Sequence, residues 1–329
     1  MLDPDYPRDL IGYGANPPDP EWPKGAKLAL NFVINYEEGS EYSLLHGDDQ
    51  SEAFLSEVTQ ATNWPGQRHW NMESMYEYGS RAGFWRLHRM FTQRDLPVTV
   101  YGVAMALARN PEAVAGMKAA GWEIASHGLR WIEYKDFSVE AERAHLHQAI
   151  AMHAEATGER PLGWYTGRCS VNTVDIVAAE GGFEYAADSY ADDLPYWHHA
   201  PTGPQLILPY TLDANDARFI SSQGWGGPRD FHEYLSNSVE ILLENMPNVG
   251  DVTVERSVDA GADGLNSYVV YTITFESEVA NMLNLKIISK HNNESKPPDV
   301  ILLFKVLRGH WSSLRVAQGH WPLGSRVYY

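Results

Sequence analysis

The chain has 329 residues, of which 44% are hydrophobic and 12% aromatic, and its formal net charge is −18. This composition supports a sizeable core and excludes a wholly disordered chain, while the length fits one large α/β domain or a domain with an appendage. The acidic charge argues against binding to nucleic acid or to an anionic membrane, because both need a basic patch. We therefore expect a small-molecule substrate.

The cysteine content and the first residues of the chain indicate in which cellular compartment the protein works. The single cysteine, Cys169, excludes an intramolecular disulfide framework and is typical of a reducing environment. The chain does not start with the basic and apolar regions of a signal peptide, and no run of about 18 apolar residues occurs. The sequence therefore predicts a cytoplasmic protein without a membrane span, and it leaves the formation of a homo-oligomer open.

From residue 27 onward, short apolar runs alternate with amphipathic stretches, which is typical of parallel strands joined by crossover helices. We expect strands at 27–36, 97–103, 122–127, 160–165, 184–188 and 205–211. We expect helices at 73–94, 111–120, 138–157, 170–181 and about 230–246, with Gly181 and Gly182 ending the fourth. The pattern predicts an α/β fold with a parallel sheet or barrel.

Residues 37–72 interrupt this alternation. They are rich in Gly, Ser, Asp and Asn, and they are too long and irregular for an ordinary connection between a strand and a helix. Long surface loops of this kind often carry function. We interpret 37–72 as a loop over an active site.

Near residue 236 the sequence changes character. Most of the acidic excess lies before this point, and alternating or apolar runs of strand type follow it at 252–255, 268–275 and 300–304. The sequence therefore predicts a first domain at 1–235 and a β-rich, antiparallel segment at 236–329.

The first predicted strand ends in Asn35-Tyr36-Glu37-Glu38-Gly39. Successive strand residues face opposite sides, so Glu37 and Glu38 point different ways, and Gly39 allows the backbone to turn sharply. One carboxylate can then face a pocket while its neighbour faces the structure. This indicates an enzyme, and the alternative is a solvated acidic loop.

Three more polar residues follow predicted strands, at the edge where parallel sheets place their active sites. His127 and Asp188 each end a predicted strand, and Arg168 lies in a turn bracketed by glycine, where it could face an anionic or carbonyl oxygen. The alternatives are a structural histidine, a surface ion pair and a solvated loop.

Taken in order, these motifs resemble the polysaccharide deacetylase superfamily (NodB homology, carbohydrate esterase family 4), and more closely its cofactor-free allantoinase branch. The family's first strand ends in Thr-Phe-Asp-Asp-Gly, where one Asp is the base and the next binds a metal, and here Asn35-Tyr36-Glu37-Glu38-Gly39 takes that place. The family's His-x-x-x-His motif supplies two metal ligands, and here His127 matches the first while Trp131 stands at the second. The resemblance implies a distorted (β/α) barrel with neither a catalytic metal nor a cofactor.

The resemblance also implies hydrolysis of a carbon–nitrogen bond in a small cyclic ureide, with allantoin converted to allantoate. Glu37 would act as the base that activates water. His127 and Arg168 would polarise the carbonyl group or protonate the leaving nitrogen, and Glu38 would orient one of them.

Four further residues are expected to bind the substrate. Trp131, Trp164 and Tyr165 would form flat walls that suit a planar heterocycle, and Asp188 would contact the substrate from the strand that follows.

Residues 236–329 do not match the family. Its members carry one more parallel strand, which brings a last histidine to the pocket, whereas His291, His310 and His320 do not follow such a strand. A fusion is compatible with this segment, and we expect weak or absent hydrolysis by this chain. Two alternatives stay open, namely a deacetylase of N-acetylated sugars or polysaccharides and a catalytically inactive barrel that binds a ligand or partner.

Overall fold

The computed structural model describes residues 6–23, 26, 28–58, 60–217 and 227–244, together with the backbone of strands 252–260, 266–275, 283–292 and 299–306. The chain divides into two compact units. Leu30–Phe231 forms the larger part of one unit, and the other contains the residues before Leu30 and most of those from His232 onward. The domain boundary that the sequence predicts at residue 235 stays a prediction.

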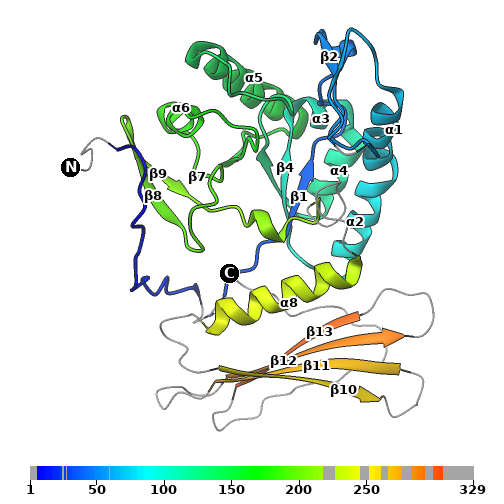
Figure 1. The fold of residues 1–329 in the computed structure, drawn as a ribbon, viewed down its shortest axis with the longest axis vertical. Helices are drawn as coiled ribbons and strands as arrows, with labels where there is room; N and C mark the ends of the chain where they lie inside the picture. Colours follow the sequence, from blue (N-terminus) through cyan, green and yellow to red (C-terminus); the bar gives the residue numbers. More distant parts are fainter. Residues whose placement is uncertain are drawn as a thin grey trace. The chain divides into compact units, whose positions relative to one another are not determined.

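A seven-stranded, mostly parallel sheet lies at the centre of the Leu30–Phe231 unit (Figure 1). Its strands, in spatial order, are β1 (Val33–Tyr36), β4 (Thr99–Gly102), β5 (Glu123–Ser126), β6 (Gly163–Trp164), β7 (Tyr185–Ala186), β9 (Gly203–Ile207) and β8 (Tyr196–Ala200). All neighbours pair in parallel except β8 and β9, which form an antiparallel hairpin. The predicted α/β class, with a sheet of the NodB barrel type, is confirmed.

The observed strands lie within or close to the predicted runs but are shorter. The first begins at Val33 rather than residue 27, because pairing with the next strand begins with Val33 opposite Thr99. The hairpin strand β8 was not predicted, because its sequence Tyr-Trp-His-His-Ala lacks the alternation of a half-buried strand.

Helices cover the outside of this sheet (Figure 1). They are α1 (Trp70–Tyr78), the π-helical segment η3 (Gly79–Gly83), α2 (Phe84–Thr92), α3 (Ala104–Arg109), α4 (Pro111–Ala119), α5 (Val139–Thr157) and α6 (Thr173–Glu180). The single helix expected at 73–94 is therefore corrected: π-helical hydrogen bonding interrupts it at Gly79–Gly83. Gly181 ends α6 with a left-handed φ of 78°, as expected.

The long connection after β1 has some regular structure of its own. It contains a short 3₁₀ turn, η2 (Leu44–His46), and a small antiparallel pair formed by β2 (Gln50–Ser51) and β3 (Trp64–Pro65). A second 3₁₀ turn, η4 (Leu212–Ala214), follows β9.

The core lies on both faces of the sheet. Val100, Leu107 and Met117 are fully buried between the sheet and its helices, and each such side chain contributes about 2 kcal/mol by leaving water. The other face buries aromatic and small residues, among them Tyr101 and Tyr165. The predicted site residues Glu37, His127 and Asp188 follow strands of this sheet, at its carboxyl edge.

The other unit contains most of α8 (Pro228–Glu244) and a four-stranded antiparallel sheet. Its strands are β10 (Val252–Ala260), β11 (Asn266–Phe275), β12 (Leu283–Asn292) and β13 (Asp299–Val306). The antiparallel strands predicted at 252–255, 268–275 and 300–304 are confirmed, and β12 adds one that was not predicted. His310 and His320 lie outside the described residues.

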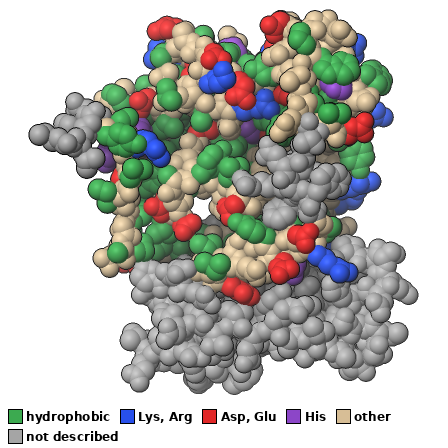
Figure 2. Space-filling view, viewed as in Figure 1, with side chains coloured by type: hydrophobic (Ala, Val, Ile, Leu, Met, Phe, Trp, Pro, Cys, Tyr) green, Lys and Arg blue, Asp and Glu red, His purple; other side chains and the backbone are tan. Residues whose placement is uncertain are grey.

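Within the described part of the chain, no helix is both long and apolar enough to cross a bilayer. On the face drawn in Figure 2, acidic side chains are spread among hydrophobic and neutral ones, with Lys and Arg between them. The cytoplasmic location stays a prediction.

Candidate active site

Four of the predicted site residues follow four different strands of the parallel sheet. Glu37 comes directly after β1, His127 directly after β5, and Arg168 and Asp188 lie shortly after β6 and β7. Because the carboxyl ends of parallel strands meet at one edge, the fold brings these side chains to the same end of the sheet.

Glu37 and His127 contact each other directly. Glu37 Oε1 lies 3.2 Å from His127 Nε2, and the His127 side chain is only 1% exposed, against 20% for Glu37. His127 Nδ1 is buried without a hydrogen-bond partner among the described residues. The contact is an ion pair when His127 is protonated, and Nδ1 is the ring nitrogen for which no described residue supplies a partner.

Glu38 faces away from this pair. Its Oε2 accepts a hydrogen bond of 3.0 Å from the backbone N–H of Glu37, and its Oε1 lies so close to Gly79 that a Cβ there would approach it to 2.4 Å. Burial, reinforced by the charge of Glu37, raises the pKa of Glu38 to about 7. The expectation that Glu38 orients His127 or Arg168 is corrected, because alternation along the strand end turns it toward η3, where it holds the backbone of Glu37.

Arg168 is oriented by Glu52, a residue of the long loop that no sequence pattern marks as functional. Arg168 Nη1 lies 3.0 Å from Glu52 Oε2, and the Glu52 side chain is 4% exposed. Glu52 Oε1 accepts hydrogen bonds from the backbone N–H groups of Ala53 and Phe54. These bonds hold the carboxylate in place independently of its contact with the Arg168 guanidinium. A buried carboxylate that is held in this way fixes the direction of Arg168.

Two of the three predicted aromatic walls lie beside the polar residues. The Arg168 guanidinium carbon is 3.6 Å from the centroid of the Trp131 ring, which is cation–π contact. The Tyr165 ring lies 4.8 Å from that of His127 and stacks on Tyr210 at 4.7 Å with an interplanar angle of 3°. Aromatic rings therefore contact both Arg168 and His127.

Trp164 is placed elsewhere, and its predicted role as a wall is corrected. It alternates with Tyr165 across β6, so its ring enters the core cluster that contains Ile176 and Phe183. Its Nε1 donates to Thr166 Oγ1 at 2.8 Å, and its ring packs edge-on against Phe183 at 5.3 Å.

Asp188 holds the turn that carries Arg168. Its carboxylate accepts hydrogen bonds of 2.8 to 2.9 Å from the backbone N–H groups of Thr166 and Gly167. Burial raises the pKa of Asp188 to about 6, although the hydrogen bonds from these two N–H groups act in the opposite direction. Contact between Asp188 and a substrate stays a prediction.

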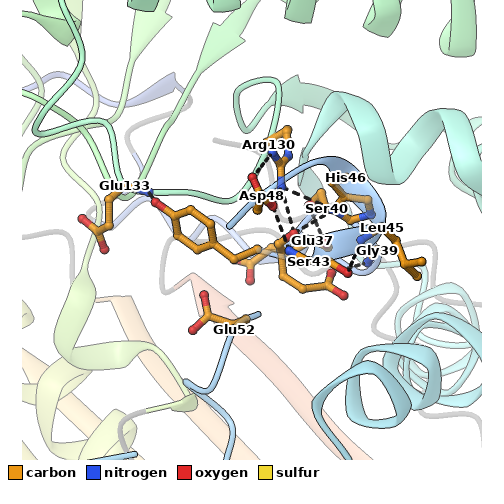
Figure 3. Close-up of polar contacts among 12 residues, drawn as sticks. Glu37, Gly39, Ser40, Ser43, Leu45, His46, Asp48, Glu52, Arg130 and Glu133 are labelled. Carbon is orange, nitrogen blue, oxygen red and sulfur yellow. Dashed lines mark hydrogen bonds and ion pairs between the residues drawn. The ribbon is translucent and has the colours of Figure 1, made fainter. Parts of the chain in front are cut away.

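A second polar cluster fixes the loop that follows Glu37 (Figure 3). Arg130 donates from both Nη atoms to the Asp48 carboxylate, at 2.8 and 2.5 Å, and also to the backbone oxygen of Glu41. Asp48 in turn accepts from the backbone N–H of Ser43. Through Arg130, the segment after β5 is tied to the loop that begins at Glu37 and reaches Glu52.

The described residues do not suit the metal that the resembled family binds. No group of three His, Cys, Asp or Glu side chains that could hold a metal ion occurs in the described part of the chain. Glu37 and His127 contact each other, Glu38 faces η3, and Trp131 has no ligand atom.

The chain is similar to known proteins over most of the Leu30–Phe231 unit. Residues 71–186 match the family model described as "Polysaccharide deacetylase". A Schizosaccharomyces pombe protein named "Putative polysaccharide deacetylase" is 37% identical over 256 residues, which is 72% of this chain and 80% of that protein. The fold and the family define a deacetylase-type hydrolase. The chain belongs to the polysaccharide deacetylase family.

Two solved structures are similar over most of their length. The PuuE allantoinase is 55% identical with a TM-score of 0.70, and the match covers 72% of this chain and 80% of that one. A probable polysaccharide deacetylase from Pseudomonas aeruginosa PAO1 is 54% identical with a TM-score of 0.71, over 74% of this chain and 82% of that one.

Proposed function

We propose that this chain is a metal-independent, allantoinase-like amidohydrolase, which adds water across a carbon–nitrogen bond of a small cyclic ureide such as allantoin. The observation that carries the proposal is the direct contact of 3.2 Å between Glu37 and His127 at the place where related enzymes hold a metal. The 55% identity to the PuuE allantoinase supports the choice of substrate.

Water is a weak nucleophile toward an amide, so the site must remove a proton as the new carbon–oxygen bond forms. In this proposal Glu37 takes that proton. Its partly exposed carboxylate can reach a water molecule, and the buried ring of His127 contacts one of its oxygens.

The reaction also needs stabilisation of the oxyanion and a proton for the leaving nitrogen. The Arg168 guanidinium, fixed by Glu52, carries the positive charge that stabilises the oxyanion. His127 gives a proton to the nitrogen as the carbon–nitrogen bond breaks and then recovers one from Glu37. The products are a carboxylic acid and a free N–H group, so the water is fully accounted for.

The aromatic surroundings support a flat substrate. Trp131 lies against Arg168 and Tyr165 lies against His127, so an aromatic ring adjoins each of the two polar groups. A planar heterocycle buries its faces against such rings while its edge carries the groups that form hydrogen bonds.

A deacetylase acting on N-acetylated sugars is the second candidate, and the 54% identity to the probable polysaccharide deacetylase from Pseudomonas aeruginosa supports it. The same base and oxyanion groups could attack an acetamide. The lack of a three-ligand metal group in the described residues favours the metal-independent reaction over this one.

Sheet closure limits the expected rate. Within the described residues β1 pairs only with β4, so one edge of the strand that delivers Glu37 has no strand beside it. Water at this edge weakens electrostatic stabilisation of an oxyanion, and we expect slower turnover than in a closed barrel.

One assay tests the proposal. Purified full-length chain is incubated with allantoin and, separately, with an N-acetylglucosamine oligomer, and the formation of allantoate and of acetate is measured. We expect allantoate alone. Acetate release would favour the deacetylase, and failure to form either product would indicate a catalytically inactive barrel.

A further inference from the structure

Tyr76, on α1, has a buried hydroxyl group without a partner. The residue is 5% exposed, and no described residue forms a hydrogen bond with its Oη. Buried tyrosine hydroxyls nearly always find a partner, because removal from water without a compensating hydrogen bond costs free energy. An orphaned hydroxyl in this position therefore calls for an explanation.

The surroundings of Tyr76 place it at the candidate active site. Its ring packs edge-on against Trp131 at a centroid distance of 6.1 Å, on the same indole that lies under Arg168. Burial raises the pKa of Tyr76 well above its ordinary value, and the charges of Glu52 and Glu37 raise it further. The hydroxyl thus stays protonated among the groups that would surround a substrate.

The chemistry of these neighbours defines what the hydroxyl can do. Glu37 and Glu52 are acceptors that are engaged with His127 and Arg168, and Arg168 is a charged donor. A neutral donor against Trp131, in the field of these charges, suits an uncharged acceptor, and the carbonyl oxygens of a cyclic ureide are such acceptors.

We propose that the Tyr76 hydroxyl binds the substrate by donating a hydrogen bond to one of its carbonyl oxygens, next to Trp131. The inference rests on the proposed function, since it assigns a further contact in the same site. It explains why a polar atom is kept in a position where phenylalanine would fill the same space without an unpaired hydroxyl.

The test is Tyr76→Phe in the full-length chain, which removes one oxygen atom and keeps the ring. We expect kcat/KM for allantoin to fall about tenfold, the factor for a lost hydrogen bond of about 1.4 kcal/mol, while the melting temperature stays equal or rises. A tyrosine that serves only the core would give unchanged kcat/KM, and that result would overturn the proposal.

Tyr185→Phe is the matched control. The Tyr185 hydroxyl donates to Glu123 Oε1 at 3.0 Å, so this variant breaks an existing hydrogen bond. It should lower the melting temperature and leave kcat/KM close to that of the wild type, which is the opposite pattern.

The two proposals fail in different ways. If the wild type hydrolyses allantoin and Tyr76→Phe does so equally well, only the role of Tyr76 is wrong. If the wild type neither hydrolyses allantoin nor binds it in calorimetry, both are wrong. If it releases acetate from the N-acetylglucosamine oligomer instead, the proposed function is wrong, and an undiminished rate in Tyr76→Phe with that substrate overturns the role of Tyr76 as well.

Discussion

Glu37 Oε1 and His127 Nε2 lie 3.2 Å apart, although the strands that carry them, β1 and β5, are separated in the sheet by β4. The two side chains therefore reach across the end of the intervening strand. Such a contact fixes the direction of the Glu37 carboxylate relative to the His127 ring.

Replacement of Glu37 by glutamine should abolish most hydrolysis without unfolding the protein. The amide keeps the size and shape of the side chain but cannot take a proton from water, so kcat should fall at least on the order of a hundredfold. The far-ultraviolet circular dichroism and the melting temperature serve as the check on folding. Near-normal turnover would move the base elsewhere, and Glu38 would be tested next.

Glu38 should make stability depend on pH. Burial raises its pKa from 4.5 to about 7, so between these values the folded state binds more protons than the unfolded state. The free energy of unfolding then falls as the pH rises through this window, and Asp188, with a pKa of about 6, acts in the same direction.

The measurement for Glu38 compares the wild type with Glu38→Gln by denaturant unfolding at pH 4.5 and pH 8. The two should be alike at pH 4.5, whereas at pH 8 the variant should be more stable by up to about 3 kcal/mol. If the wild type and Glu38→Gln differ in unfolding free energy by the same amount at pH 4.5 and at pH 8, Glu38 does not titrate in this window.

Arg168 has two carboxylate neighbours, and only one should matter for activity. Glu52 is 4% exposed with Oε2 at 3.0 Å, whereas Glu133 is 48% exposed with Oε1 at 3.7 Å. Glu52→Gln should lower kcat/KM on the order of tenfold to a hundredfold, because a misdirected guanidinium no longer meets the oxyanion. Glu133→Gln is the control and should stay within about twofold. Equal effects of the two variants would contradict the orienting role of Glu52.

The Arg130–Asp48 pair should stabilise the loop that follows Glu37. Both side chains are largely buried and the guanidinium binds the carboxylate with two nitrogen atoms, so Arg130→Lys should cost about 2 kcal/mol in unfolding free energy. Arg68→Lys is the matched control, because Arg68 makes the same two-nitrogen contact with Glu73 at an exposed position. Its cost should be below about 1 kcal/mol. Equal costs would mean that the Arg130 contact does not depend on burial.

The sequence was informative where residues follow strands. Apolar runs of strand type located the ends of β1, β5 and β7, and Glu37, His127 and Asp188 follow from that placement alone. The antiparallel strands after residue 250 were also visible, because alternation with a period of two is a local property.

Other features depend on contacts that local patterns do not encode. Glu52 meets Arg168 across 116 residues of sequence, and it lies in a loop without any periodicity that would indicate which side chains turn inward. Trp164 and Tyr165 point to opposite faces of the sheet, but both are aromatic, so the sequence does not show which of the two rings faces the helix-covered core. The π-helical break at Gly79–Gly83 lies where Gly79 packs against the Glu38 carboxylate, a tertiary contact that helical spacing does not reveal.

The most direct test of the central claim, that Glu37 and His127 hydrolyse an amide without a metal ion, is the rate of allantoin hydrolysis before and after exhaustive chelation, with the metal content of both samples measured. We predict the same rate in both samples and no gain when zinc is added back. Loss of hydrolysis on chelation, with recovery on addition of stoichiometric zinc, would contradict the account.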